Sequence, residues 1–175
     1  MMKVGYDMYA RLLKETIAEL KGEAVEQKLN TDVEIEIEAY APDTYIPLQT
    51  ERMTFYQQLA SCETLDEIEQ VKAQLADVYG AIPKQVDNLF AVATLKLLAN
   101  KAGVAKVAVK PARGEITFAN RDKMMRKEVF EALSAAGERV TASPNSYGIV
   151  FSSPDFLQKT RLMDAVTEFL KSIQT

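Results

Sequence analysis

The stretch Ala41-Pro42-Asp43-Thr44-Tyr45-Ile46-Pro47 separates two segments whose hydrophobic residues repeat with different periods. Each proline fixes its own φ and disfavours helix in the residue before it, so the stretch predicts a defined loop. Between the prolines, Tyr45 and Ile46 are expected to be buried against the core. The loop therefore marks the passage from a strand to a helix.

The residues before this loop alternate in polarity. From Asp32 to Tyr40, valine and isoleucine at every second position are separated by Glu34, Glu36 and Glu38. This alternation predicts a half-buried strand with a charged outer face. Three carboxylates on one strand face could hold a cation, but a solvated face is far more common and is the arrangement that we expect.

Two helices are predicted after the loop. The first spans Glu51 to about Ser61, with Thr50 as its N-cap and with Met53, Tyr56 and Leu59 or Ala60 on its buried face. The second opens with a capping box in which Thr64 is the cap and Glu67 is the third helical residue. This helix runs to Tyr79 and ends at Gly80. It is expected to bury Ile68, Val71, Leu75 and either Val78 or Tyr79, and to present Asp66, Glu67, Gln70, Gln74 and Asp77 to solvent.

The remaining elements do not alternate regularly between strand and helix. Further helices are predicted from Pro83 to Ala102, from Arg121 to Ala136 with Met125 and Val129 inward, and from Pro154 onward. Strands are predicted at 104–110 and 115–119, which form a hairpin, and around 140 and 148–151. We therefore predict an α+β fold: a small, mainly antiparallel sheet packed with several helices.

A separate N-terminal helix is predicted to precede this fold. From Val4 to Lys21 the apolar residues repeat at helical spacing, and Gly22 ends the pattern. Residues from Gly22 to Thr31 are polar and show no period. The predicted organisation is thus a helix over 1–22, a linker over 23–31 and a domain over 32–175.

Composition excludes several classes of site. The chain has no histidine and one cysteine, Cys62, which nearly excludes a structural zinc site and removes the commonest general base. Cys62 lies beside Glu63, whose charge would raise a thiol pKa, so it is a poor candidate nucleophile. No glycine-rich phosphate loop, signal peptide or membrane-spanning run is present. We expect a cytoplasmic binding or regulatory domain with no catalytic, cofactor or metal site and no membrane partner.

One stretch of the chain is basic. Between Thr94 and Lys127, nine Lys or Arg residues are opposed only by Glu115 and Asp122, although the whole chain carries a net charge of −4. The alternative function is therefore a nucleic-acid-binding domain that uses residues 96–127. A solvated basic face is the more common meaning of such a stretch, and aromatic residues are sparse in it.

Taken together, these landmarks resemble the C-terminal part of the bacterial transcription-repair coupling factors, the Mfd family. The resemblance covers nearly the whole chain and is most specific between Pro42 and Ala102. Its signature residues here are Pro42, Asp43, Tyr45, Ile46, Pro47, Arg52, Tyr56, Gly80 and Pro83. The chain departs from the family pattern at Gln57-Gln58, Gln74 and Val78, where charged residues are common in the family.

The resemblance implies that the chain is a fragment of an ATP-dependent DNA translocase that displaces stalled RNA polymerase and recruits nucleotide-excision repair. The first helix would end the RecG-like translocase module, and the ATPase motifs, with bound ATP and Mg²⁺, would lie upstream. The rest would be a non-catalytic regulatory domain that packs on the UvrB-like N-terminal module and masks its UvrA-binding surface. Contacts with UvrA, RNA polymerase and DNA would then be made through other parts of the parent.

In such a domain the docking candidates are Asp66, Glu67, Gln70, Gln74 and Asp77. The substitutions Glu67→Ala and Asp77→Ala are expected to leave the domain folded while weakening its docking on the UvrB-like module.

Overall fold

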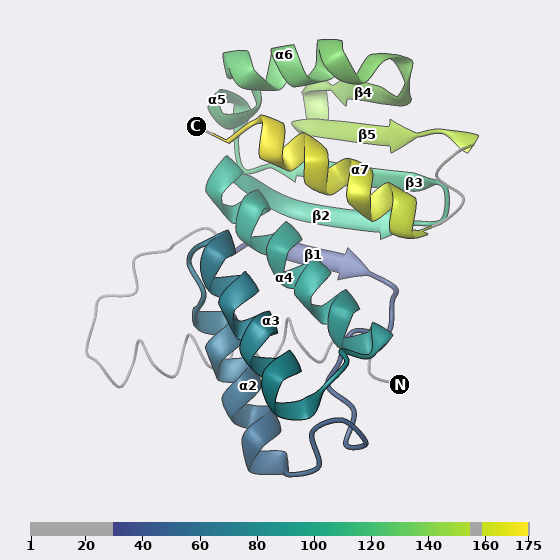
Figure 1. The fold of residues 1–175 in the computed structure, drawn as a ribbon. Coiled ribbons are helices and arrows are strands. Elements are labelled where there is room, and N and C mark those ends of the chain that lie inside the picture. Colours follow the sequence, from purple (N-terminus) through teal and green to yellow (C-terminus); the bar gives the residue numbers. More distant parts are fainter. Residues whose placement is uncertain (1–29, 155–158, 175) are drawn as a thin grey trace. The chain divides into compact units, whose positions relative to one another are not determined.

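The computed structural model describes residues 30–154 and 159–174 (Figure 1). The helix predicted from Val4 to Lys21 and nearly all of the predicted linker lie outside these residues, so the domain boundaries near residues 22 and 31 stay predictions. The described chain divides into two compact units, one of residues 37–97 and one of residues 30–36, 98–154 and 159–174. Helix α4 (Lys84–Ala102) begins in the first unit, and its last turn belongs to the second.

The second unit contains a five-stranded sheet in the order β1-β2-β3-β5-β4. Strand β1 pairs with β2 in parallel, and the other three neighbouring pairs are antiparallel. With its helices, this sheet confirms the predicted α+β class and the mainly antiparallel pairing. The strands are β1 (Asp32–Ile35), β2 (Val104–Lys110), β3 (Arg113–Phe118), β4 (Val140–Ser143) and β5 (Gly148–Ser152).

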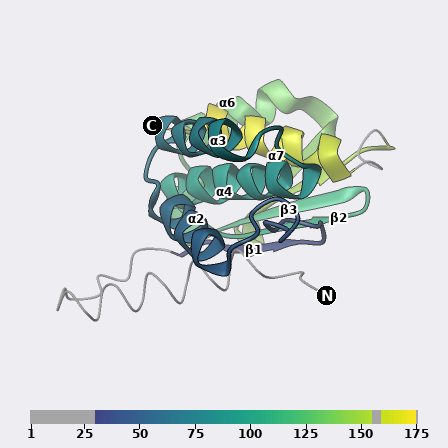
Figure 2. The same ribbon diagram turned by 60° about the horizontal axis from the view of Figure 1, so that its bottom comes forward.

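One face of this sheet is apolar, and the helices α6 (Lys127–Ala136) and α7 (Lys159–Ser172) lie on the same side of β2 and β3 (Figure 2). Helix α7 passes close to β3 at Gly114, where an added Cβ would lie 3.0 Å from Leu162 Cδ1. The missing side chain therefore lets the helix approach the strand. Phe151 of β5 meets Phe169 of α7 edge to face, with ring centroids 5.3 Å apart.

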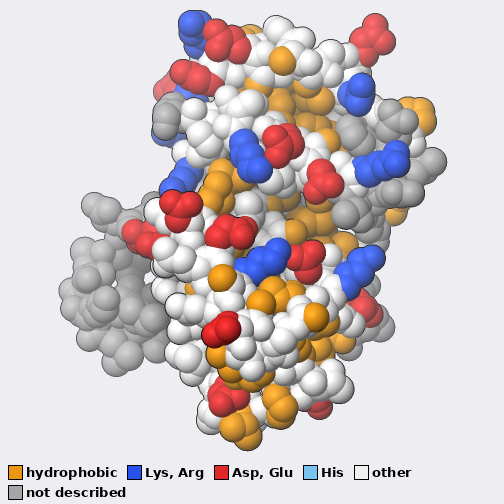
Figure 3. Space-filling view, viewed as in Figure 1, with side chains coloured by type: hydrophobic (Ala, Val, Ile, Leu, Met, Phe, Trp, Pro, Cys, Tyr) orange, Lys and Arg blue, Asp and Glu red, His pale blue; other side chains and the backbone are white. Residues whose placement is uncertain are grey.

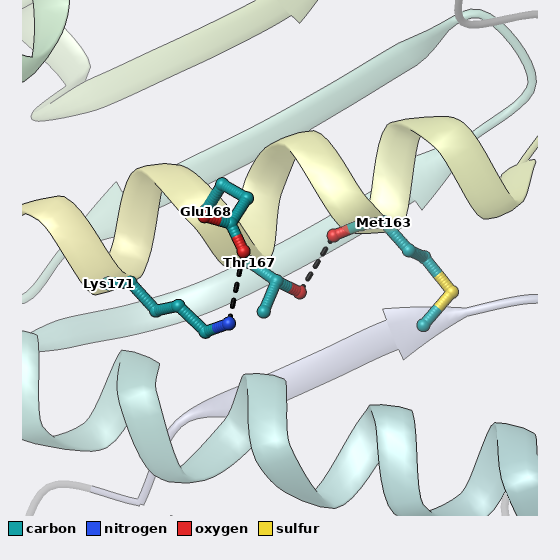
Figure 4. Close-up of polar contacts among 4 residues, drawn as sticks. All are labelled: Met163, Thr167, Glu168 and Lys171. Atoms are coloured by element: carbon teal, nitrogen blue, oxygen red, sulfur yellow. Dashed lines mark hydrogen bonds and ion pairs between the residues drawn. The ribbon is translucent and has the colours of Figure 1, made fainter.

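Polar groups of α7 find partners within the helix itself. Thr167 donates its hydroxyl to the Met163 carbonyl at 2.7 Å, and the Lys171 ammonium lies 3.0 Å from Glu168 Oε1 (Figure 4). Because the Thr167 hydroxyl bonds to the preceding turn, this half-buried residue loses no hydrogen bond. Helix α7 can therefore bury its apolar face, which consists of Leu162, Met163, Val166, Phe169 and Leu170, and Ile173 directly after the helix is buried as well.

The first unit consists of a loop over residues 37–48, helices α2 (Gln49–Ser61) and α3 (Leu65–Tyr79), and α4 up to Leu97. Phe55 of α2 packs edge to face on Phe90 of α4, with ring centroids 5.7 Å apart. Burying one such large side chain stabilises a fold by about 1.5–3 kcal/mol. The apolar residues buried in this unit include Ile46, Phe55, Leu59, Ile68, Leu75, Leu89 and Phe90.

Two predicted details of α2 are wrong. The helix begins at Gln49 with Leu48 as its N-cap residue, and the Arg52 amide donates to the Leu48 carbonyl at 3.0 Å. Thr50 therefore lies inside the first turn and caps nothing. Met53 is 37% exposed, because the face turned to the core consists of Phe55, Leu59 and Ala60.

Strand β1 is shorter than the predicted segment from Asp32 to Tyr40, since it ends at Ile35. The last paired residues are Ile35 of β1 and Val109 of β2, and β2 has only one residue, Lys110, beyond this pair, so a strand as long as the predicted one would lack backbone partners. In the hairpin formed by β2 and β3, strand β3 begins at Arg113 rather than at the predicted Glu115. Two residues, Pro111 and Ala112, are enough to form the turn.

The helix predicted from Arg121 to Ala136 is divided into α5 (Arg121–Met124) and α6. Arg126 lies between them with an extended backbone, and its Nη2 donates to the Ala102 carbonyl at 2.7 Å. The helix is interrupted at Arg126, and the buried methionine is one residue earlier than predicted. Met124 is buried, whereas Met125, predicted to point inward, is 46% exposed.

Candidate functional site

Helix α3 begins with the predicted capping box. The Glu67 amide donates to Thr64 Oγ1 at 3.2 Å, and Glu67 Oε2 accepts from the Thr64 amide at 3.3 Å and from the Glu63 amide at 2.6 Å. These bonds satisfy amide groups that a helix N-terminus otherwise leaves without partners. The capping box is therefore confirmed, and it fixes the first turn of α3.

The five predicted docking residues are exposed and lie together on α3. With 3.6 residues per turn, they fall within about 100° of the helix circumference. Ile68 and Leu75 on the other side of α3 are 2% and 6% exposed, so this helix has one buried face and one outer face. The outer face, which we call the α3 face, carries Asp66, Glu67, Gln70, Gln74 and Asp77.

The α3 face is not chemically uniform. Glu67 is occupied by the capping box, so its replacement would perturb the helix as well as any docking. Gln70 and Gln74 line an open groove of about 290 Å³ whose opposite wall includes Gln58 of α2. Asp66 and Asp77 make no ion pair or hydrogen bond with the side chains that the structure describes. These two aspartates are thus the charges of the face that a partner could pair with.

Sequence reasoning left open whether Val78 or Tyr79 points inward from the last turn of α3. Val78 is 70% exposed, and it adds an apolar side chain beside the α3 face. Tyr79 takes the inner position, where its hydroxyl donates to Glu51 Oε2 at 2.7 Å and its ring lies 5.7 Å from that of Tyr45. The bond to Glu51 also raises the pKa of the Tyr79 hydroxyl.

Most of the signature residues come together around the proline-bounded loop of the first unit. The amides of Tyr45 and Ile46 both donate to the Pro42 carbonyl at 3.0 Å, which closes a turn. Ile46 is fully buried, as predicted, whereas Tyr45 is half-buried. The Tyr45 hydroxyl donates to the Gly80 carbonyl at 2.9 Å and links the loop to the end of α3.

Two signature residues on α2 hold this loop from the other side. Arg52 Nη1 donates to the carbonyls of Ile46 and Pro47 at 2.7 and 3.1 Å. The Tyr56 hydroxyl accepts from the Ala41 amide at 2.8 Å. The loop is therefore stabilised by side chains from an adjacent helix rather than by secondary structure of its own.

Cys62 lies where the groove between α2 and α3 ends, and its thiol donates to the Gln58 carbonyl at 3.2 Å. Burial raises the pKa of this thiol, and the charge of Glu67 raises it further. The sequence suggested that Glu63 would raise the pKa of this thiol, but the carboxylate that does so is Glu67. A thiol with a raised pKa is poorly ionised at neutral pH, so this environment disfavours a nucleophilic role.

The basic residues of the segment 96–127 do not form one surface. Lys96 is buried, Lys106 pairs with Glu34 at 3.1 Å, and Lys127 pairs with Glu131 at 3.3 Å. Arg126 is used in holding the end of α4. On the side of the second unit seen in Figure 3, Lys and Arg side chains alternate with Asp and Glu. This mixture disfavours the nucleic-acid alternative.

The polar face of the sheet also mixes basic and acidic side chains. On the strand positions that point away from α6 and α7, the pairing places Lys106, Lys110 and Arg113 among Asp32, Glu34 and Glu115. The carboxylate of Glu34 has a lowered pKa because Lys106 donates a hydrogen bond to it. Glu34 therefore serves as an ion-pair partner in the sheet rather than as part of a cation site.

Two kinds of feature, a metal-binding cluster and a membrane-spanning helix, are absent from the described residues. Residues 30–154 and 159–174 contain no group of three or more His, Cys, Asp or Glu side chains placed to hold a metal ion. Within the same residues, no helix combines the length and the apolar character that crossing a membrane requires.

Comparison with known proteins agrees with the resemblance seen in the sequence. The model of the TRCF domain family matches residues 35–129. The transcription-repair-coupling factor of Bacillus subtilis is 30% identical over 148 residues, which cover 83% of this chain and 12% of that protein. The Escherichia coli protein of the same name is 31% identical over 127 residues, which cover 70% of this chain and 11% of that protein. The chain thus spans about one eighth of the length of these relatives.

A solved structure shows the same fold. The crystal structure of the C-terminal domain of a transcription-repair coupling factor superposes with a TM-score of 0.75 at 23% sequence identity. The match covers 86% of this chain and 95% of that one. Because the family model matches more than half of the chain, and this fold agrees with it, the chain belongs to the TRCF domain family, the C-terminal domain of transcription-repair coupling factors.

Proposed function

We propose that this chain is the regulatory C-terminal part of a bacterial transcription-repair coupling factor and that it acts by binding rather than by catalysis. In this proposal it docks on the UvrB-like N-terminal module of the same protein and masks the surface that binds UvrA. The whole protein would be a cytoplasmic ATP-dependent DNA translocase that displaces stalled RNA polymerase. ATP and Mg²⁺ would be bound outside this chain.

The α3 face carries the proposal. Asp66 and Asp77 are exposed on one side of a helix whose other side is fully used by the core, and neither has a partner among the described side chains. An acidic face of this kind is suited to arginines on a docked module. Charge pairs at an interface set its specificity, and truncating one partner of a desolvated pair costs about 2–5 kcal/mol. Exposed Val78 would add apolar contact at the same place.

The test uses the intact coupling factor in the absence of RNA polymerase. Replacing Asp66 and Asp77 together by Asn removes two charges without touching the capping box, so the fold is retained and docking is weakened. The double variant is expected to capture more UvrA in a pull-down than the unchanged protein. Glu69→Gln is the matched control, because Glu69 is exposed on α3 outside this face and should leave UvrA capture unchanged.

If the double variant captures no more UvrA than the unchanged protein, the α3 face is not the mask. If Glu69→Gln raises UvrA capture as much as the double variant does, the effect follows from the overall charge of the helix and the proposed face is again rejected.

A further inference from the structure

The first unit contains a second surface feature, a pocket of about 640 Å³ that is open to solvent. Its wall is formed by the loop from Tyr40 to Tyr45, by Arg52 of α2, and by Pro83 and Gln85 at the start of α4. This volume lies within the range of about 300–1,000 Å³ that ligand pockets occupy. None of the α3 face residues lines it, so it is separate from the docking surface proposed above.

The wall of the pocket is held in place before any ligand arrives. The turn at Pro42, the bonds from Arg52 Nη1 and the bond between the Ala41 amide and the Tyr56 hydroxyl fix the loop at several points. The Asn88 side-chain amide also donates to the Glu38 carbonyl at 3.0 Å, at the beginning of the loop. A preorganised wall lowers the entropy lost on binding.

Arg52 retains hydrogen-bonding capacity in this pocket. Both of its bonds leave from Nη1, and within the described residues neither Nε nor Nη2 has an acceptor and no carboxylate lies within ion-pair distance. A guanidinium with a free edge binds a carboxylate through two parallel hydrogen bonds. The Arg52 side chain is thus positioned by the loop and still able to bind an acid.

Other polar groups of the wall are also without partners among the described residues. The Tyr40 hydroxyl, the Gln85 amide and the Asp43 carboxylate make no hydrogen bond or ion pair there. By contrast, the hydroxyls of Tyr45, Tyr56 and Tyr79 in the same unit are all bonded. The pocket therefore gathers the unused polar groups of this loop around one guanidinium.

We propose that this pocket binds an aspartate or glutamate side chain on an exposed segment of a protein partner, with Arg52 as the carboxylate-binding residue. The open shape suits a protruding side chain, and a Tyr- and Arg-lined wall is typical of protein interfaces. Asp43 on the same wall disfavours ligands with several negative charges, such as nucleic acids, and leaves a single carboxylate as the fitting group.

The test measures binding of capped tripeptides to the 175-residue chain by NMR, through the Nε–Hε resonance of Arg52. Acetyl-Gly-Glu-Gly-amide is expected to shift this resonance saturably at millimolar concentration, whereas acetyl-Gly-Gln-Gly-amide should not. Asp43→Asn removes the repelling charge and is expected to tighten binding of the Glu peptide about twofold to fivefold. Asp66→Asn is the matched control on the α3 face and should leave the affinity unchanged.

Arg52→Lys keeps the positive charge and a donor for the loop but loses the planar edge, and it is expected to weaken the preference for the Glu peptide over the Gln peptide when followed through the Tyr40 ring. The proposal is overturned if both peptides shift Arg52 equally, if neither does, or if Asp43→Asn leaves the affinity for the Glu peptide unchanged. Since no residue of the α3 face lines the pocket, these outcomes are independent of UvrA capture.

Discussion

Ala112 has a backbone conformation that is unfavourable for an alanine. It is the second residue of the β2–β3 turn and has a φ of 63°, in the left-handed region that glycine adopts most readily. For an alanine, this conformation is unfavourable by about 1–2 kcal/mol. A glycine avoids this strain but loses more conformational entropy on folding, which destabilises the folded state by about 0.5–1 kcal/mol. The first cost is the larger, so Ala112→Gly is expected to stabilise the protein by about 0.5 kcal/mol, measured by urea unfolding.

Ala91→Gly is the matched control for this substitution. Ala91 is exposed in the middle of α4, where glycine is expected to cost about 1 kcal/mol. Destabilisation by both substitutions would show that the backbone of Ala112 is not strained.

At the scale of elements, the first turn of α3 is held by its capping box. Removing the hydroxyl in Thr64→Ala leaves the Glu67 amide without its acceptor, which is expected to cost about 1 kcal/mol of unfolding free energy. Thr64→Ser keeps the oxygen, and Glu67→Gln keeps a side-chain acceptor for the Thr64 amide, so both should remain close to the unchanged protein. Urea unfolding followed by circular dichroism measures all three; equal stability of Thr64→Ala and Thr64→Ser would contradict this account.

The same element explains why stability and docking must be tested at different residues. Glu67 belongs both to the cap and to the α3 face, so a loss of docking in Glu67→Ala would have two causes. Asp66 and Asp77 take no part in the capping box, although the charge of Asp66 lies in the first turn of α3 and favours the helix dipole. A docking test is therefore interpretable only when it leaves the capping box intact.

For the molecule as a whole, the charge distribution predicts weak binding to DNA. The chain carries a net charge of −4, and several basic residues of the segment 96–127 are paired with carboxylates. In a fluorescence anisotropy titration at physiological salt, we expect duplex DNA to bind more weakly than the roughly 10⁻⁴–10⁻⁶ M typical of non-specific binding proteins.

The variant Glu34→Lys with Glu131→Lys provides a positive control, because it frees Lys106 and Lys127 and adds two further positive charges. This variant should bind DNA more tightly and with a steeper salt dependence. Tight, salt-dependent binding by the unchanged chain would contradict this prediction and support a nucleic-acid-binding domain that uses residues 96–127.

How much of this structure the sequence predicts depends on the range of the interactions involved. The capping box at Thr64 and Glu67 was predictable because both residues lie in one turn, and the buried face of α7 because its apolar residues repeat at helical spacing. The thirteen residues of α2 were placed to within two positions, but its buried face was misassigned at Met53. Only contact with Phe90, far along the chain, shows that Phe55 is the residue turned inward.

By itself, the amino-acid sequence determined the number and kind of most elements, the α+β class, the outer position of Asp66 and Asp77, and the family resemblance carried by the proline-bounded loop. These properties depend on backbone preferences and on periods of a few residues. The tertiary structure alone decided where β1 ends, which of Val78 and Tyr79 is exposed, and that Arg52 both bonds to the loop and lines a pocket. Each of these depends on a strand, a ring or a carbonyl supplied from elsewhere in the fold, and no local pattern encodes such a partner.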